Sequence, residues 1–316
     1  MEVDLKPEFK GRDFISINDF TRDEVLYIME VADILKAQQK SGVRRDPGYL
    51  QGKSLGMIFQ KASTRTRVSF EVGMFQLGGY PLFLSPNDMQ MGRGETIKDT
   101  AMTLSRYLDG IMIRTFSHDD VLELAHWATI PVINGLTDLL HPCQAMGDMM
   151  TIREHKGRLE GLKLAFIGDG NNVAHCLLYG GAKTGMDVVI ACPKGFEPDN
   201  QVLQNALKDA QQTGCKLRVV EDPIEAVTGA DVVYTDVWAS MGQEKDAADK
   251  EKHFARYQVN AELMKHAKPD AIVMHCLPAK RGREVTDEVM DGPQSVMFDE
   301  AENRLHMQKA IMALIM

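Results

Sequence analysis

The sequence predicts an α/β fold with two similar domains, each a parallel sheet covered by helices on both faces. Three observations support this prediction. Short apolar runs alternate with segments of helical periodicity along the 316 residues. The alternation becomes strict from Gly161 onward. Polar, chemically capable residues follow several of the predicted strands, as ligand-binding residues do in open parallel sheets. A chain of this length accommodates two domains of ordinary size.

The first half begins with an amphipathic helix at 21–39, capped by Asp19 or Thr21. The strands that we expect after it lie at 54–59, 82–84, 109–114 and 130–134. The helices between and after them lie at about 68–77, 97–108, 119–128 and 142–154. Pro142 suits the first turn of the last of these helices. We expect a first domain over residues 1–145.

The second half contains predicted strands at 163–167, 187–191, 217–220, 231–235, 271–275 and 295–298. Predicted helices occupy 173–184, 199–212, 224–227 and 301 to the C-terminus. The charged segment 245–253 has no predicted structure. We expect a second domain over 146–300, with the helix at about 301–316 packing back on the first domain. The active site is expected in the cleft between the two domains.

Composition excludes several classes of protein. The net charge of −9 and the absence of a basic run with interleaved aromatic residues argue against nucleic-acid binding. No apolar run approaches the length of a membrane span, and the N-terminus lacks a secretion or import pattern. Five cysteines without a close pair fit a reducing compartment. We therefore expect a cytoplasmic protein that does not bind membranes.

The turn Ser63-Thr-Arg-Thr-Arg67 lies between a predicted strand and a predicted helix. Backbone N–H groups at a helix start, together with hydroxyl and guanidinium groups, form a site for phosphate or a similar anion. Taken alone, this turn is also explained as a helix cap with two solvated arginines. Further polar residues just past other strands argue for one shared site: Arg114, His141, Gln144, Asn171, Asn172, Asp236, His275, Cys276 and Arg304.

Three rival sites fit the sequence poorly. The glycine turn Gly168-Asp-Gly-Asn-Asn-Val173 has valine where a dinucleotide-binding turn needs its third glycine, and no acidic residue ends the next strand. A phosphate-binding Gly-x-x-x-x-Gly-Lys is absent. His141 and Cys143 lack the spacing of a metal site, and no His-Glu-x-x-His or Cys-x-x-Cys occurs. We therefore expect neither a cofactor nor a metal.

Four motifs in the same order and register resemble the aspartate/ornithine carbamoyltransferase superfamily over essentially the whole chain. They are Ser63-Thr-Arg-Thr-Arg67, His141-Pro-Cys-Gln144, Asp236-Val-Trp-Ala-Ser-Met-Gly242 and His275-Cys-Leu-Pro278. The third motif is similar to that of the ornithine members, as is Asp299-Glu-Ala-Glu-Asn-Arg-Leu-His306. The resemblance implies transfer of the carbamoyl group from carbamoyl phosphate to the δ-amine of L-ornithine, giving citrulline and phosphate in arginine biosynthesis.

The resemblance also implies a role for individual residues. Arg114, His141 and Thr66 would polarise the carbamoyl oxygen, Asp236 would position the amine, and Cys276 would contribute to catalysis. Gln90 would reach the phosphate of a neighbouring subunit, which implies a homotrimer with shared sites. The residues implied to bind carbamoyl phosphate are Ser63, Thr64, Arg65, Thr66, Gln90, Arg114, His141, Pro142, Cys143, Gln144, Cys276, Leu277 and Arg304. Those implied to bind ornithine are Asn172, Asp236, Ser240 and Met241.

Two alternatives remain open from the sequence. The accepting amine could be a related compound, such as putrescine or N-acetylornithine. The chain could also be a non-catalytic, two-domain protein that binds an anion or an amino acid. The convergence of Arg114, His141 and Arg304 on one anion argues against the second alternative.

Overall fold

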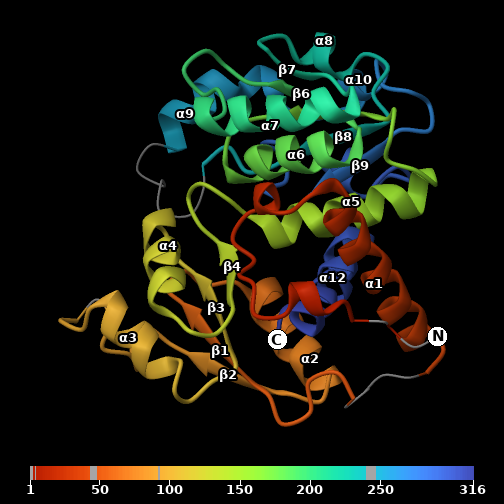
Figure 1. Ribbon diagram of the computed structural model, residues 1–316. Helices are drawn as coiled ribbons and strands as arrows, with labels where there is room; N and C mark the ends of the chain where they lie inside the picture. Colours follow the sequence, from red (N-terminus) through yellow and green to blue (C-terminus); the bar gives the residue numbers. More distant parts are fainter. Residues whose placement is uncertain (1–2, 4, 43–47, 92, 240–246) are drawn as a thin grey trace. The chain divides into compact units, whose positions relative to one another are not determined.

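The computed structural model describes residues 3, 5–42, 48–91, 93–239 and 247–316. The chain divides into two compact domains. Domain 1 comprises Met1–Gly147 and Asn303–Met316, and domain 2 comprises Asp148–Glu302. Each domain contains one parallel sheet with helices on both faces, which confirms the predicted α/β class (Figure 1).

The sheet of domain 1 has the strand order β2-β1-β3-β4. Its strands are β1 (Ser54–Phe59), β2 (Tyr80–Leu84), β3 (Gly110–Arg114) and β4 (Val132–Leu136). The chain runs from β1 outward to β2 and then returns to β3 on the other side of β1. The switch point of the topology therefore lies between β1 and β3, where open parallel sheets bind ligands. Phe59 and Arg114 are register partners at the carboxyl ends of these two strands.

Helices cover both faces of this sheet. Figure 1 shows α3 and α4 on one side and α1 and α12 on the other. A buried cluster that includes Ile58, Ile111, Val121 and Leu124 fills the space between the sheet and the α3–α4 side. The helices with residues in this domain are α1 (Arg22–Lys40), α2 (Thr64–Gln76), α3 (Ile97–Leu104), α4 (His118–Trp127), α5 (Pro142–Lys156) and α12 (Met297–Ile315). The domain boundary falls within α5 and within α12.

The sheet of domain 2 has the strand order β7-β6-β5-β8-β9. Its strands are β5 (Lys163–Ile167), β6 (Asp187–Ala191), β7 (Leu217–Val220), β8 (Val232–Thr235) and β9 (Ile272–His275). The chain runs outward from β5 through β6 to β7 and then returns to β8, so the switch point lies between β5 and β8. Ile167 and Thr235, the last residues of these strands, are register partners.

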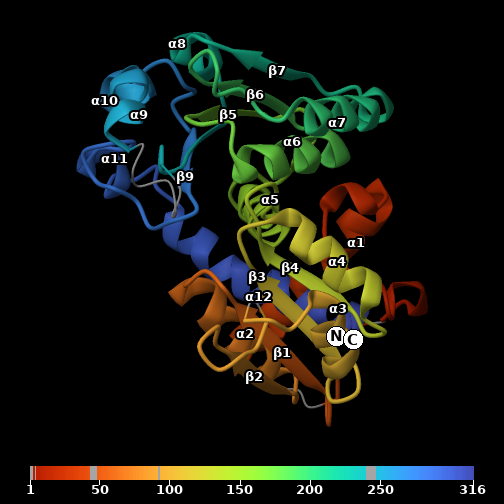
Figure 2. The ribbon, with the colours of Figure 1, turned by 90° about the vertical axis from the view of Figure 1, so that its left-hand side faces the viewer.

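Figure 2 shows α6 and α7 on one side of this sheet. The opposite side is filled by a buried cluster from the strands and α8 to α11, including Val233, Val273, Phe254 and Tyr257. Within the described ranges, no helix is long and apolar enough to cross a membrane. The helices of this domain are α6 (Asn172–Thr184), α7 (Asn200–Thr213), α8 (Pro223–Val227), α9 (Ala247–Phe254), α10 (Ala261–Met264) and α11 (Asp287–Met290).

Two elements differ in type from the sequence prediction. Most of the charged segment 245–253 is not structureless, because α9 covers 247–254. Phe254, at the end of α9, is fully buried and stacks on Trp238 at a ring-centroid distance of 5.9 Å. This apolar anchor orders a segment whose own composition is polar.

The predicted last strand at 295–298 is also wrong. Ser295 forms only an isolated bridge to Val273, and α12 begins at Met297. Met297 is buried whereas Phe298 is 73% exposed, so this apolar run is the first turn of a helix. Among the smaller shifts, β4 begins at Val132 instead of 130, and α3 ends at Leu104 instead of 108.

Gly170 permits a close backbone contact in the turn after β5. A Cβ atom at this position would lie 2.3 Å from the backbone nitrogen of Pro198. Because backbone atoms cannot move aside cheaply, Gly170→Ala should lower the free energy of unfolding by about 3 kcal/mol. Urea denaturation followed by tryptophan fluorescence measures this loss.

Gly195 provides the control for this prediction. It has a φ of +89° and open space around it, so Gly195→Ala should cost only about 1 kcal/mol through its backbone conformation. Equal losses in the two variants would show that the contact with Pro198 is not tight.

Candidate active site

The turn after β1 begins α2 in the manner of a capped helix. Ser63 is the N-cap residue, and its Oγ accepts a hydrogen bond from the Thr66 backbone N–H at 3.1 Å. The side chain of Thr64 is exposed, and that of Arg65 is partly buried. The N-terminus of α2, with its positive dipole end, therefore lies at the switch point of domain 1.

Two buried guanidinium groups meet at the side chain of Thr66. Arg114, the last residue of β3, donates from Nη1 to Thr66 Oγ1 at 3.4 Å. Arg304, in the second turn of α12, donates from Nη2 to the same oxygen at 2.9 Å. All three side chains are buried. This arrangement concentrates positive charge beside a helix N-terminus and suits an anion.

His141 is buried and electrically neutral in this environment. Burial lowers the pKa of its imidazole well below the usual value, and the positive charges of Arg304, Arg114, Lys61 and Arg65 lower the pKa further. A neutral imidazole can donate a hydrogen bond from one nitrogen, but it is not an acid at physiological pH. His141 is therefore suited to polarise a bound oxygen and not to protonate it.

The residues that follow His141 begin α5. Pro142 occupies its first turn, and the Gln144 backbone N–H donates to the His141 carbonyl at 3.1 Å. Gln144 is almost fully buried. The Cys143 thiol donates to the Asn134 carbonyl at 3.4 Å, and burial raises its pKa to about 12. The Cys143 side chain thus packs against β4, so its backbone is the part available to a ligand.

A pocket of about 380 Å³ opens beside the turn after β1. Arg65 and Arg67 differ in exposure, because the side chain of Arg65 is partly buried and that of Arg67 is exposed. Arg67 lies over the ring of Phe83 at 3.8 Å and pairs with Glu71 at 3.3 Å. The described residues that line the pocket are Phe59, Gln60, Ala62, Ser63, Thr64, Arg67, Phe83 and Pro86.

In domain 2, Asn171 joins the start of α6 to a carboxylate. Its side-chain oxygen accepts from the backbone N–H groups of Val173 and Ala174, so it caps the helix. Its Nδ2 donates to Asp236 Oδ2 at 2.8 Å. The sequence prediction named both Asn171 and Asn172 among the polar residues of the site, but it assigned ornithine binding to Asn172 alone. The glycine turn before α6 contained the signal, since asparagine is a favoured N-cap residue.

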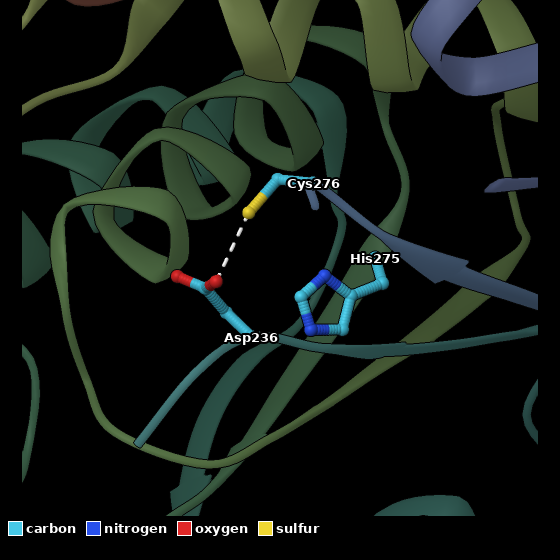
Figure 3. A group of neighbouring side chains, drawn as sticks. All are labelled: Asp236, His275 and Cys276. Atoms are coloured by element: carbon cyan, nitrogen blue, oxygen red, sulfur yellow. Dashed lines mark hydrogen bonds between the residues drawn. The ribbon is translucent and has the colours of Figure 1, made fainter. Parts of the chain in front are cut away.

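Cys276 donates its thiol hydrogen to the other oxygen of Asp236 (Figure 3). The Cys276 Sγ lies 3.0 Å from Asp236 Oδ1. Burial raises the pKa of this thiol well above its usual value, and the charge of Asp236 raises it further. Cys276 is therefore a protonated hydrogen-bond donor and not a thiolate nucleophile.

His275 fixes the chain after β9. Its Nδ1 accepts from the Leu277 backbone N–H at 2.8 Å, and its Nε2 lies 3.2 Å from Glu284 Oε1. Asp236, His275 and Cys276 bring potential metal ligands within 4.8 Å of one another. Both ring nitrogens are occupied by these contacts, however, so the imidazole has no lone pair directed at a cation.

The predicted site residues fall into two groups, one in each domain. Gln90 is exposed in the loop between β2 and α3, and Ser240 and Met241 lie outside the described residues. The predicted residues of domain 1 around the α2 turn, the α5 start and α12 are Ser63, Thr64, Arg65, Thr66, Arg114, His141, Pro142, Cys143, Gln144 and Arg304. Those at the strand ends of domain 2 are Asn172, Asp236, Cys276 and Leu277.

Comparison with known proteins matches both domains to one family. The protein-family model described as "Aspartate/ornithine carbamoyltransferase, carbamoyl-P binding domain" matches residues 12–154. A second family model, "Aspartate/ornithine carbamoyltransferase, Asp/Orn binding domain", matches residues 160–315.

Full-length relatives give the same result. The ornithine carbamoyltransferase of Carboxydothermus hydrogenoformans is 60% identical over 308 residues and covers 98% of both chains. That of Symbiobacterium thermophilum is 62% identical over 307 residues and covers 97% of this chain and 98% of its own. The solved structure of ornithine carbamoyltransferase from Pyrococcus furiosus superposes with a TM-score of 0.94 at 55% identity and covers 98% of both chains. The resemblance in the motifs is therefore confirmed, and the chain belongs to the ornithine carbamoyltransferases of the aspartate/ornithine carbamoyltransferase superfamily.

Proposed function

We propose that this protein transfers the carbamoyl group of carbamoyl phosphate to the δ-amine of L-ornithine and releases citrulline and phosphate. The observation that carries the proposal is the convergence of Arg114 and Arg304 on Thr66 at the N-terminus of α2. The phosphate group of an acyl phosphate is bound well by this combination of guanidinium groups and helix N–H groups. Membership of the ornithine carbamoyltransferases supports the choice of both substrates.

The domain 1 residues would bind carbamoyl phosphate. Ser63, Thr64, Arg65 and Thr66 hold the phosphate at the start of α2, and Arg304 adds a further positive charge. Arg114 and the neutral imidazole of His141 donate to the carbamoyl oxygen, where negative charge develops as the amine attacks. Gln144 contacts the carbamoyl nitrogen, while Pro142 and Cys143 contribute backbone at the start of α5.

The domain 2 residues would bind ornithine. Asn172, Ser240 and Met241 recognise the amino acid, and Asp236 contacts its δ-amine. An amine of this type has a pKa of about 10.4, so only about 0.1% is neutral near pH 7.4. A carboxylate raises that pKa, so Asp236 contributes by orienting the amine and not by deprotonating it. Its own orientation is set by Asn171 and Cys276.

The proposed reaction requires no covalent intermediate and no separate protein base. The amine attacks the carbamoyl carbon, the bond from that carbon to the phosphate oxygen breaks, and the departing phosphate accepts the amine proton. Cys276 and Leu277 offer backbone carbonyls to the carbamoyl amide. The raised pKa of the Cys276 thiol agrees with a role that uses no thiolate.

We also propose that the protein is a cytoplasmic homotrimer of arginine biosynthesis. One relative, from Pyrococcus furiosus, is named an anabolic ornithine carbamoyltransferase. Domain 1 exposes an apolar surface along α2 and the edge strand β2, formed by Val68, Val72, Phe75, Tyr80 and Leu82. Exposed apolar patches of this kind support association with another subunit. The exposed Gln90 would reach the phosphate site of a neighbouring subunit.

The direct test is incubation with carbamoyl phosphate and ornithine, followed by detection of citrulline and phosphate. Arg65→Ala should weaken carbamoyl phosphate binding about 100-fold, because it removes charge-assisted hydrogen bonds to the phosphate. The exposed Arg106→Ala serves as the control and should bind normally. Calorimetric titration measures both affinities.

Three results would contradict the proposed function. If the wild-type protein forms no citrulline, the assignment as an enzyme is wrong. If it turns over putrescine or N-acetylornithine faster than ornithine, the accepting amine is not ornithine. Normal carbamoyl phosphate affinity in Arg65→Ala would move the phosphate site away from the α2 turn.

The trimer predicts a sedimenting mass three times the 35.3 kDa of the chain. Phe75 is 54% exposed, and a charge placed there would be buried at the expected interface, so Phe75→Glu should dissociate the trimer. Ile224 of α8 is 45% exposed, and Ile224→Glu should leave the mass unchanged. A trimer that survives Phe75→Glu would place the interface elsewhere.

A further inference from the structure

Glu300 is a buried carboxyl group that contacts two strands of domain 2. It lies in the first turn of α12 and is 1% exposed. The Tyr234 hydroxyl donates to its Oε1 at 3.0 Å, and the His275 backbone N–H donates to its Oε2 at 3.0 Å. Tyr234 belongs to β8 and His275 to β9. One side chain therefore links the ends of two neighbouring strands.

The contacts of Glu300 lie beside the residues proposed to act on ornithine. Tyr234 of β8 precedes Asp236 by two residues, and His275, the last residue of β9, directly precedes Cys276. Asp236 and Cys276 are joined by the 3.0 Å sulfur–oxygen hydrogen bond across the two strand ends. Any change in the separation of the strand ends would change this hydrogen bond.

A second acid holds Glu300 in place. Asp148 of α5 is fully buried and forms a side-chain hydrogen bond with Glu300. Two carboxyl groups can share a hydrogen bond only when a proton lies between them, since both are acceptors when ionised. Burial raises the pKa of Glu300 well above its usual value, and the charge of Asp148 raises it further. The pair therefore retains one proton at pH values where an exposed glutamate is ionised.

Among the described residues, the ionisable groups near this pair include Tyr234 and Cys276, and Asp236 interacts with both of them. Burial raises the pKa of the Tyr234 hydroxyl and of the Cys276 thiol, and the charges of Asp148 and Glu300 raise both further, so these two groups remain protonated donors. The His275 imidazole contacts Glu284, so only its backbone N–H meets Glu300. The Tyr234 hydroxyl and the His275 backbone N–H thus donate to Glu300 without adding a positive charge that would neutralise it.

We propose that Glu300, in a shared-proton pair with Asp148, is a positioning residue that fixes the ends of β8 and β9 and so aligns Asp236 with Cys276. This inference rests on the proposed ornithine reaction, because its effect is exerted on the acceptor amine. Glu300 does not touch the substrate. It acts through Tyr234 and the His275 backbone, and the proton shared with Asp148 prevents repulsion between the two buried carboxyl groups, so that the Glu300 oxygens stay in place to accept these hydrogen bonds.

Tyr234→Phe tests the link to β8. The variant retains the aromatic stacking on Phe166, whose ring centroid lies 5.8 Å away, and lacks only the hydroxyl that donates a hydrogen bond to Glu300. We expect kcat to fall about 3- to 10-fold, the range that one net hydrogen bond represents, with a smaller change in the KM for ornithine. Carbamoyl phosphate affinity and binding stoichiometry, measured by calorimetry without ornithine, should not change.

Asp299→Asn is the matched control. Asp299 precedes Glu300 on α12, but its carboxylate contacts His155 at the surface. This variant should retain the wild-type kcat. If Tyr234→Phe also retains it while the wild-type enzyme forms citrulline, the positioning role is wrong and the proposed function stands. If the wild-type protein forms no citrulline, the proposed function itself is wrong.

Asp148→Asn tests the shared proton. Because the folded pKa of Glu300 is raised, its stabilising contribution is present at low pH and is lost as pH rises through the raised value. Asparagine donates an N–H to Glu300, so ionised Glu300 could remain in place. The kcat/KM for ornithine of the variant, divided by that of the wild type, should therefore increase with pH. The Tm of the variant minus the Tm of the wild type should increase with pH as well. Ratios that stay constant with pH would overturn the shared-proton pair.

Discussion

The hydroxyl of Thr66 is the point on which the proposed carbamoyl phosphate site depends. Three separate elements meet there: the capped start of α2, the end of β3 through Arg114, and the second turn of α12 through Arg304. Gly147 permits the approach of α12, because a Cβ atom at that position would lie 3.2 Å from Arg304 Cγ. Burial lowers the pKa of His141, and the concentrated positive charge lowers it further, so the imidazole stays neutral.

The two domains use the same topological position for different chemistry. In domain 1 the functional residues follow β1, β3 and β4, and in domain 2 they follow β5, β8 and β9, so each set includes the two strands that flank the switch point. In domain 1 this position gathers positive charge for an anion. In domain 2 it gathers a carboxylate, a thiol and amide groups, which suit a cationic amine. The difference follows from the residues at the strand ends and not from the strand order.

The sequence predicted most of the fold because its strands are short, apolar and regularly spaced. It also predicted the α2 turn, since Ser63 before a helical segment is an ordinary N-cap signal. It failed at α9 and at 295–298, where burial of Phe254 and Met297 decides the local structure and the composition of the segment does not. Tertiary contacts of this kind leave no local pattern in a sequence.

The candidate site was predictable only in part for the same reason. Residues in recognisable motifs could be named as candidates from the sequence, but Asn171 and Glu300 acquire their roles through contacts with Asp236 and His275 that are distant in sequence. Tyr234 and Asp148 likewise resemble ordinary members of a strand and a helix. Residues that position others have no motif of their own, so their contacts must be seen in three dimensions.

The ionisation of His141 tests the central claim that buried arginines create a positive site for an anion. Nuclear magnetic resonance of ring-labelled histidine, with the His141→Asn variant to identify its signal among the nine histidines, measures its pKa. Without an anion, the pKa of the ring should lie well below the ordinary value, and inorganic phosphate should raise this pKa by offsetting the arginine charges. A ring that titrates at the ordinary value of about 6.5 and does not respond to phosphate would contradict the account.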